Sequence, residues 1–362
     1  MMDICYASNE AYVPYLAVSM FSCIYRNLQE DHLHFHVISN GISEESRARL
    51  QENAALARGK SGGKHTVSLR FYDLSDLPER LGGHMDTGSY DISMLGRFFI
   101  GELLPERVEQ VLYLDCDTVV ADSLLPLFCK MEQGTLPGNG SPAVCGVPEP
   151  TIYPSIVRQL GLDPEKEIYI NSGVLLVDLV RWRTERIGER LLRFYIKNGE
   201  KLFCGDQDAI NYVLRGSIGY LPPRYNFFTN YRYFRYNTLV RLWPLYAEKS
   251  GGKAQFTAAV RKPAVIHYMG AERPWINGNH NPFRRQYEEY LALSAYADRQ
   301  QIKGRELQML LYHLMNCLSL VCPWSRKLIS RGFEQKYVLP RLRPPGAQSD
   351  ERKQPICRDI AE

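Results

Sequence analysis

The chain lacks several sequence motifs that identify common enzyme activities. Its nine cysteines form no Cys-x-x-Cys pair, and their odd number and irregular spacing favour a reducing compartment over a disulfide framework. No Gly-x-Gly-x-x-Gly follows a strand-like run and no Gly-x-Ser-x-Gly occurs, so a dinucleotide fingerprint and a nucleophile elbow are both missing. The net charge of only +4 gives no general case for nucleic acid as a partner.

A secretory leader and a membrane-spanning run are missing as well. The N-terminal MMDICYASNE carries an early Asp3 and no basic residue before an apolar stretch, so we expect it to form the first strand of a cytoplasmic protein. The most apolar segment, 309–322, is shorter than the roughly 20 residues that cross a bilayer. It also contains the polar His313 and Asn316.

Three histidines, His32, His34 and His36, alternate along one strand-like segment and could in principle hold a transition metal. The residues between them are apolar, which is typical of a strand with one buried face. An amphipathic strand with exposed histidines is therefore the preferred interpretation.

What the chain does contain is an alternation of strand-like and helix-like patterns over its first 130 residues. The expected strands are 3–7, 33–38, 67–72 and 111–114. The expected helices are 12–27, 43–57 and 94–103. This alternation predicts an α/β fold with a mostly parallel, Rossmann-like sheet flanked by helices.

The most informative segment is VLYLDCDTVV, in which the apolar run Val111 to Leu114 ends at Asp115 and Asp117. Such a run predicts a strand buried on both faces, and open α/β sheets bind ligands where their strands end. The two carboxylates are two residues apart, so on extended backbone they point the same way and suit Mg²⁺ or Mn²⁺. Acidic residues are also common in turns and caps, so the motif alone leaves the two roles evenly balanced.

A second buried strand begins with Asn171, Ser172 and Gly173. An asparagine side chain both donates and accepts, as sugar hydroxyls require, and the small Ser-Gly pair lets a ligand approach the backbone. A simple Asx turn leading into a strand explains the same residues and, by itself, is the better explanation.

A rival Asp-x-Asp lies in CGDQDAINYVL, where the following apolar residues recur at helical spacing. This spacing places Asp206 at or near a helix N-terminus and favours a capping role for one of the two acids. The pair is therefore a poorer metal site than Asp115 and Asp117. The helix start could still present Asp206 and Gln207 to sugar hydroxyls.

The segment AVIHYMGAERPW combines a strand end with His267, a turn glycine, Gly270, and the basic Arg273. His267 could supply a third metal ligand through a ring nitrogen. A histidine satisfied within the fold is the alternative, and it is the more common one where no other context is known.

In order and spacing, these motifs together resemble glycosyltransferase family 8 over roughly residues 3–275. The matching pieces are LDCDTVV, NSGVLL, DQDAIN, RYNFFTNY and HYMGAERPW. The resemblance is nearest to bacterial lipopolysaccharide galactosyl- and glucosyltransferases. It implies a GT-A fold and retaining transfer of a hexose from UDP-glucose or UDP-galactose to a glycan or lipid-linked saccharide acceptor, with Mn²⁺ or Mg²⁺.

The resemblance also implies roles for single positions. The implied metal ligands are Asp115, Asp117 and His267. The implied catalytic residues are Arg97, Asp206 and Gln207. The implied donor-binding residues are Ala7, Asn9, Tyr12, Arg97, Asp115, Cys116, Asn171, Ser172, Gly173, Asp206, Gln207, Gly270 and Arg273.

Three of these positions need comment. Asn9 stands where the family often has Asp, although its carbonyl oxygen can still accept the uracil N–H. Arg273 stands where the family usually has Lys, which keeps the charge but changes its geometry. Gln207 matches the residue debated as the nucleophile, and because an amide is a poor nucleophile we expect front-face attack by the acceptor.

The resemblance and composition predict a catalytic domain at 1–280, a helical basic appendage at 281–345 and a disordered tail at 346–362. Between 323 and 345, six Lys or Arg face one acid, Glu334, and aromatic residues interleave with them. Such an end suits a peripheral protein on the inner face of a membrane, and the alternative is a helix packed on the catalytic domain.

Two other functions use the same residues. A sugar-nucleotide hydrolase or nucleotidyltransferase needs the same metal site, but not the full set of motifs. A catalytically silent sugar-nucleotide-binding protein needs no intact ligand set, whereas all three implied ligands are present.

Overall fold

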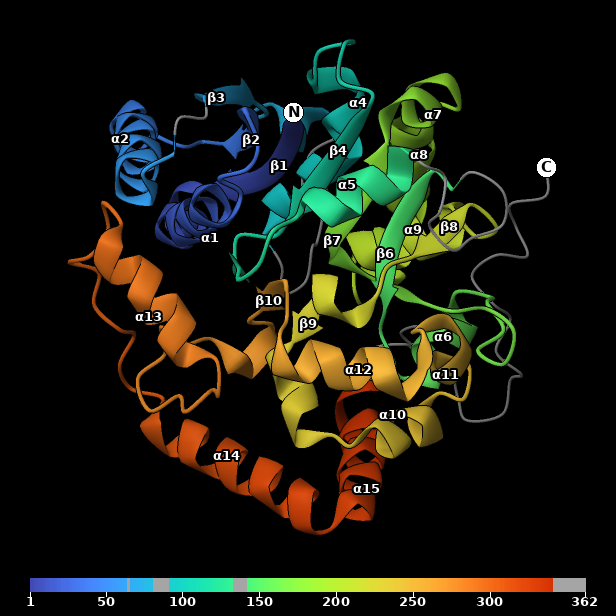
Figure 1. Ribbon diagram of the computed structural model, residues 1–362. Coiled ribbons are helices and arrows are strands. Elements are labelled where there is room, and N and C mark those ends of the chain that lie inside the picture. Colours follow the sequence, from blue (N-terminus) through green and yellow to red (C-terminus); the bar gives the residue numbers. More distant parts are fainter. Residues whose placement is uncertain (64–65, 81–90, 133–141, 341–362) are drawn as a thin grey trace.

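The computed structural model describes residues 1–63, 66–80, 91–132 and 142–340. The tail expected at 346–362 lies outside these residues, as do the basic residues 341 and 343. Within the described residues, the architecture is one large twisted sheet with helices on both faces, a small second sheet, and a run of helices at the C-terminal end (Figure 1).

The large sheet has seven strands in the order β3-β2-β1-β4-β7-β6-β8. The strands are β1 (Met2–Asn9), β2 (His32–Asn40), β3 (Thr66–Asp73), β4 (Gln110–Leu114), β6 (Val144–Pro148), β7 (Ile170–Asp178) and β8 (Ile218–Tyr220). All paired strands in it are parallel except at β7, which runs antiparallel to β4 and β6. The four strands expected from the sequence are confirmed, as is the mostly parallel sheet.

Two apolar clusters cover the two faces of this sheet. Along β1, Ile4 and Tyr6 face the side of α1 (Val13–Arg26) and α2 (Glu44–Ser61), whereas Cys5 and Ala7 face the opposite side. The elements on that side are the 3₁₀ helix η2 (Ile92–Phe99), α4 (Ile100–Leu103), α7 (Leu179–Thr184), α8 (Ile187–Asn198) and α9 (Asp206–Val213). The expected helices are confirmed, but 94–103 begins as 3₁₀ and α2 continues to Ser61.

The small sheet consists of β5 (Thr118–Val120), β10 (Val265–His267) and β9 (Phe227–Phe228) in the order β5-β10-β9. The chain leaves β4 at Leu114 and enters β5 at Thr118, so residues 115–117 bridge the two sheets. Because β5 pairs antiparallel with β10, Thr118 lies opposite His267.

Short helices complete the described chain. They are η1 (Glu10–Tyr12), α3 (Leu77–Arg80), α5 (Leu125–Glu132), α6 (Pro154–Gln159), η3 (Gly199–Lys201), η4 (Pro223–Tyr225), η5 (Thr229–Tyr233), α10 (Tyr236–Leu242), α11 (Tyr246–Lys249), α12 (Gly252–Arg261), η6 (Gly270–Glu272), α13 (Arg284–Leu293), α14 (Glu306–Val321), α15 (Pro323–Phe333) and the π-helix η7 (Glu334–Val338). The last four form the helical C-terminal region. In the part of the chain that is described, no helix combines the length and the apolarity that crossing a bilayer requires.

The histidines of β2 do not all follow the expected pattern. His32 is exposed, but His36 is buried, with Nε2 2.8 Å from Asp3 Oδ1 and Nδ1 2.9 Å from Tyr72 Oη. Because β1 and β3 pair on either side of β2, their polar side chains satisfy His36 within the sheet. The expectation of exposed histidines is therefore wrong for His36.

Candidate functional site

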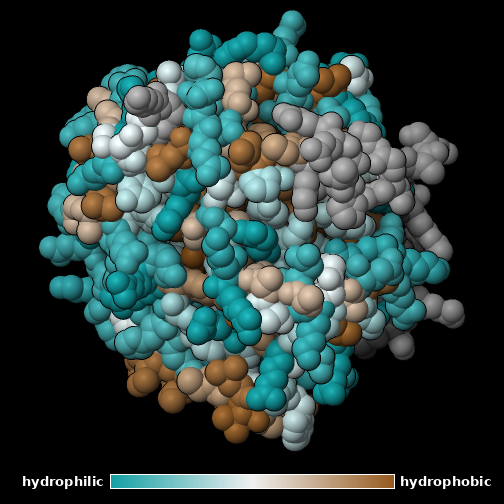
Figure 2. All heavy atoms as spheres, in the orientation of Figure 1, coloured by the Kyte–Doolittle hydropathy of each residue, from teal (hydrophilic) through white to brown (hydrophobic). Residues whose placement is uncertain are grey.

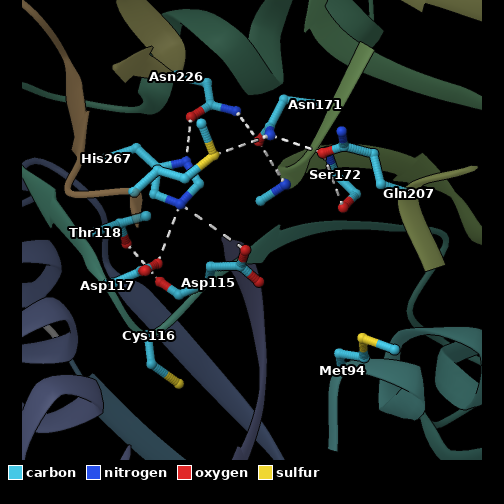
Figure 3. Close-up of polar contacts among 12 residues, drawn as sticks. Met94, Asp115, Cys116, Asp117, Thr118, Asn171, Ser172, Gln207, Asn226 and His267 are labelled. Carbon is cyan, nitrogen blue, oxygen red and sulfur yellow. Dashed lines mark hydrogen bonds and ion pairs between the residues drawn. The ribbon is translucent and has the colours of Figure 1, made fainter. Parts of the chain in front are cut away.

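The predicted site residues meet at one edge of the large sheet. Strands β4 and β6 end at this edge, and the antiparallel β7 begins there, so Asn171 and Ser172 lie beside the residues that follow β4. The backbone N–H of Asp115 donates to the carbonyl of Gly173 at 2.8 Å, which fixes the two segments together. Figure 3 shows these side chains converging with His267 from the small sheet.

Asp115, Asp117 and His267 form a compact set of metal-ligand atoms. Their ligand atoms all lie within 4.8 Å of one another, and the part of the chain that the structure describes contains no second such group. His267 Nε2 lies 3.1 Å from Asp117 Oδ1 and 3.9 Å from Asp115 Oδ2. Two carboxylates and one imidazole form a mixed oxygen and nitrogen set that suits a divalent cation such as Mn²⁺.

This convergence requires a glycine at position 173. A Cβ there would lie 2.3 Å from His267 Cε1 and 2.7 Å from Asp115 Oδ2. Real Cβ atoms do not approach other atoms so closely, so any larger residue would push the ligands apart. Gly173 thus lets two candidate metal ligands, His267 and Asp115, approach each other, and the expectation that it also lets a ligand approach the backbone stays a prediction.

A chain of amides orients His267. Its Nδ1 lies 2.9 Å from Asn226 Oδ1, and Asn226 Nδ2 donates to Asn171 Oδ1 at 2.9 Å. Because Asn226 Oδ1 is an acceptor, Nδ1 donates to it and Nε2 faces the carboxylates, where a protonated Nε2 donates to Asp117 and a neutral one offers its lone pair to a cation. Burial by itself lowers the pKa of His267, but the charge of Asp117 and its hydrogen bond outweigh burial and raise it.

The amide chain continues to a buried carboxylate, Glu149. Asn171 Nδ2 donates to Gln207 Oε1 at 2.7 Å and to Glu149 Oε2 at 3.0 Å, and Gln207 Nε2 donates to the same Glu149 oxygen at 3.1 Å. Gln207 Oε1 also accepts from the backbone N–H of Ser172 at 3.0 Å. Burial raises the pKa of Glu149, although hydrogen bonds from the two amides oppose the shift.

Arg97 joins the metal-ligand set to the helix start. From its place in η2, its guanidinium lies 2.9 Å from Asp115 Oδ1 and 3.1 Å from Asp206 Oδ2, and Nη1 donates to the carbonyl of Ser172 at 2.5 Å. The guanidinium also lies over the Tyr113 ring. Burial opposes the charge on Arg97, yet the two aspartates raise its pKa above the usual value.

The two acids at 206 and 208 have different roles, as the spacing predicted. Asp208 Oδ2 accepts from the backbone N–H groups of Phe203 and Cys204, both at 2.8 Å, so Asp208 closes the turn before α9. Asp206 instead faces the site, where Ser172 Oγ donates to it at 3.0 Å. Burial raises the pKa of each carboxyl to about 6. The charge of Arg97 opposes this shift at Asp206, and hydrogen bonds oppose it at Asp208.

The end of β1 and the short helix η1 lie at the same edge. Cys116 Sγ donates to the carbonyl of Ala7 at 3.4 Å, and Asn9 Oδ1 accepts from the backbone N–H of Tyr12 at 3.1 Å. Tyr12 is half-buried, and burial raises its pKa. The charge of Arg273 lowers that pKa, and the charge of Asp117 raises it. The predicted nucleotide-contacting residues therefore border the metal-ligand set.

The turn after β10 brings a cation to Asp117. Gly270 has φ of +64°, a backbone conformation that favours glycine, and it begins η6. Arg273 follows, with Nη2 3.8 Å from Asp117 Oδ2 and one-third of its side chain exposed. All residues predicted for the site thus lie at one edge of the sheet.

Sequence reasoning missed Glu149, Asn226 and Tyr169, whose hydroxyl lies 3.2 Å from Gln207 Nε2. A signal existed for Glu149, because this acid ends the apolar run 143–148 just as Asp115 ends β4. Asn226 stands among aromatic residues, most of which are buried.

A model described as Glycosyl transferase family 8 matches residues 3–278, well over half of the chain. The chain belongs to glycosyl transferase family 8. This family 8 protein is 25% identical to General stress protein A of Bacillus subtilis over 303 residues, 82% of this chain and 95% of that protein. It is 24% identical to the Lipopolysaccharide 1,2-glucosyltransferase of Escherichia coli K12 over 342 residues, 90% of this chain and 91% of that protein.

Solved structures agree with this family 8 assignment. The crystal structure of galactosyltransferase LgtC in complex with donor and acceptor sugar analogs superposes with a TM-score of 0.64 at 25% identity, covering 85% of this chain and all of that chain. The glycosyltransferase GlyE of Streptococcus pneumoniae TIGR4 shares the fold, with a TM-score of 0.54 at 22% identity over 82% of this chain and 61% of its own. The predicted GT-A architecture is confirmed.

Proposed function

We propose that this chain is a retaining hexosyltransferase that transfers galactose or glucose from a UDP-sugar to a glycan or glycolipid acceptor, with Mn²⁺ or Mg²⁺ as cofactor. The observation that supports it best is the Asp115, Asp117 and His267 set, held at the edge of a GT-A sheet beside Arg273. The named activity of the Escherichia coli relative supports a lipopolysaccharide glycan as the acceptor.

The leaving group of such a transfer is a diphosphate, which carries concentrated negative charge. A divalent ion held by Asp115, Asp117 and His267 would neutralise part of that charge. Arg273, one-third exposed beside Asp117, adds a second positive charge on the same side. Asn9 and Tyr12 border the site where the uracil would bind, with the Tyr12 ring available for stacking.

Gln207 is better placed to support charge than to attack. Both ends of its amide are held, since Oε1 accepts from Asn171 and Ser172 while Nε2 donates to Glu149 and Tyr169. Leaving this network would strand buried polar groups, each at a cost of about 1–3 kcal/mol. We therefore favour front-face transfer, in which the acceptor oxygen bonds to the anomeric carbon, the bond to the β-phosphate oxygen breaks, and the departing phosphate takes the hydroxyl proton.

Product analysis tests the proposal. The protein is incubated with UDP-glucose or UDP-galactose and truncated lipopolysaccharide oligosaccharides, with Mn²⁺ or with EDTA, and products are analysed by mass spectrometry. Transfer that requires the metal supports the proposal. UDP release with free sugar as the sole product indicates a hydrolase, and donor binding without turnover indicates a silent binding protein. A glycosylated peptide carrying residue 206 or 207 in the quenched reaction would overturn front-face attack.

We also propose that α14 places the protein on a membrane surface. Its outward stripe, which we call the α14 stripe, consists of Leu307, Leu310, Leu311, Leu314, Leu318 and Val321. Each of these side chains is at least half exposed, and they recur at helical spacing. Figure 2 shows the brown patch at the lower edge of the molecule, where Figure 1 places α14.

Such a stripe is what a helix lying in a membrane interface needs. In liposome flotation, the double variant Leu310→Glu and Leu314→Glu should lose most of its binding to anionic vesicles, whereas Val180→Glu, an exposed apolar residue on α7, should keep it. Equal flotation of both variants and the wild type would overturn the membrane proposal without touching the transferase proposal.

A further inference from the structure

A cavity of about 570 Å³ lies between the segment that follows Glu149 and the C-terminal helices. One wall is the segment 150–154, and the others come from η5, α10, α14 and α15. Helices α6, α10 and α15 lie together in the lower right of Figure 1. A cavity of this size is typical of sites for small ligands, which occupy about 300–1,000 Å³.

The cavity carries a strong excess of positive charge. Arg241, Arg326, Lys327 and Arg331 line it, against one carboxylate, Glu334. That carboxylate already accepts a hydrogen bond from Ser155 Oγ at 2.5 Å. Over the described ranges, none of the four cations has a carboxylate within ion-pair distance. Arg241, Lys327 and Arg331 are exposed to solvent and Arg326 is half-buried, and an anion bound among them would be attracted by all four charges.

Arg326 is fixed in position and largely withdrawn from solvent. Its Nη1 donates to Asn316 Oδ1 at 3.1 Å, and its guanidinium lies 4.9 Å from the centre of the Phe234 ring. Burial lowers the pKa of Arg326, and the neighbouring Tyr312, Tyr153 and Glu272 offset this only in part. A flat membrane surface cannot reach such a group, whereas a small anion inside the cavity can.

The cavity adjoins the candidate active site. Thr151, on its wall, donates from Oγ1 to Glu149 Oε1 at 3.5 Å, and Glu149 holds Asn171 and Gln207. Asn230 also lines the cavity.

We propose that this cavity binds an anionic substituent, a phosphate or carboxylate, on the acceptor glycan, so that the acceptor spans from Glu149 to the four cations. The assignment of the ligand as an acceptor rests on the proposed transferase function, whereas the anion site itself does not. The site would make the enzyme prefer acceptors that already carry a negative group near the accepting sugar. The site also gives three of the six basic residues between 323 and 345 a role other than contact with lipid.

Binding of glucose 6-phosphate, compared with glucose, tests the anion site without any turnover. The titration is followed by NMR or calorimetry on protein stripped of metal and then dialysed free of the chelator, so that neither a bound metal nor a competing carboxylate takes part. We expect a dissociation constant of about 0.1–1 mM for glucose 6-phosphate and none measurable for glucose. Lys327→Ala with Arg331→Ala should weaken binding at least about tenfold, because two charge-assisted contacts are lost.

The matched control is Lys303→Ala with Lys336→Ala, which removes the same charge from exposed positions outside the cavity. Three results would overturn the proposal. They are equal weakening of binding in both variants, equal binding of glucose and glucose 6-phosphate, and no binding of glucose 6-phosphate. If the protein fails to bind the sugar phosphate while its binding to vesicles falls only in the cavity variant, Lys327→Ala with Arg331→Ala, that result would assign these cations to a membrane instead. In transfer assays, the wild type should prefer phosphorylated acceptors over unphosphorylated ones, and the cavity variant should lose this preference. If no transfer occurs at all, the proposed function fails while the binding result stands.

Discussion

At the scale of single residues, the site depends on how buried polar groups orient His267. The imidazole is almost fully buried, and one nitrogen is held by Asn226 while the other faces two carboxylates. Such a histidine has one accessible protonation pattern for binding a cation.

His267→Ala should therefore weaken Mn²⁺ binding and lower kcat/KM, each by more than about 100-fold, because one of the three proposed protein ligands is lost. Free Mn²⁺ measured by EPR during titration gives the affinity. Asn226→Ala should produce a smaller loss, about 10–100-fold, since the ligand remains but is no longer oriented. His32→Ala, an exposed histidine of β2, is the control, and a loss there equal to that of His267→Ala would contradict the assignment.

Asp208 offers a second residue-scale prediction, on stability and pH. The folded state holds its proton up to about pH 6, whereas the reference value is 3.8. Between these values the folded state binds more protons than the unfolded state, so stability falls as pH rises, by up to about 3 kcal/mol for this group. With Asn at this position, Oδ1 can accept from the backbone N–H groups while Nδ2 donates to Tyr169 Oη, which reverses the direction of that one hydrogen bond.

The stability of Asp208→Asn relative to wild type should therefore improve between pH 4 and pH 7 by up to about 3 kcal/mol. Urea unfolding at the two pH values measures this difference. Asp163→Asn, whose carboxyl is exposed and has a lowered pKa, should show no such improvement, because its pH-dependent contribution lies mostly below about pH 4. A difference that does not change with pH at Asp208 would show that the carboxyl ionises normally in the folded protein.

Some of these residues could be found from the sequence and others could not. Asp115 and Asp117 follow a strand-like run and His267 ends another, and the ends of strands in such folds are where ligands bind. Glu149 obeys the same rule but lies beside Pro148 and Pro150, and those residues suggest a turn. Asn226 could not be found, because its role depends on contacts between β9, β10 and β7 that no local pattern encodes.

At the scale of elements, β7 determines how the site is assembled. Its apolar pattern predicted a buried strand, but a buried run has the same pattern in either direction, so its antiparallel course was not predictable. The reversal brings the start of β7, rather than its end, to the site. Gly173 stands there between His267 and Asp115.

Gly173→Ala tests this arrangement. The added methyl group should displace His267 or Asp115, costing about 1–3 kcal/mol of stability and at least tenfold in Mn²⁺ affinity. Chemical unfolding and metal titration measure the two effects. Gly59→Ala, in α2 with open space around the added atom, should be neutral or stabilising. Unchanged metal affinity in Gly173→Ala would mean that the close approach is not needed.

At the scale of the whole molecule, the C-terminal helices are tied to the active-site edge. Tyr312, on α14, donates to Glu272 Oε1 at 2.6 Å, and Glu272 ends η6, immediately before Arg273. Glu272 is buried, and Asn281 Nδ2 donates to its carbonyl at 2.7 Å. The helix that carries the exposed apolar stripe therefore supports the turn that presents Arg273.

Tyr312→Phe should lower the free energy of unfolding by about 1–3 kcal/mol, because a buried carboxyl loses a donor. It should also raise KM for the UDP-sugar more than it changes kcat, since the turn with Gly270 and Arg273 loosens. Tyr337→Phe, at a half-exposed position of η7, is the matched control. An unchanged KM with reduced stability would restrict Tyr312 to a structural role.

The residues of the proposed metal site also differ in when the ribosome adds them to the chain. Asp117 and His267 are 150 residues apart in the chain. At about 5–20 residues per second, a ribosome would need roughly 8–30 s to add His267 after Asp117. During that interval the two aspartates exist without their imidazole, so a nascent chain would gain its full affinity for the ion only near the end of synthesis.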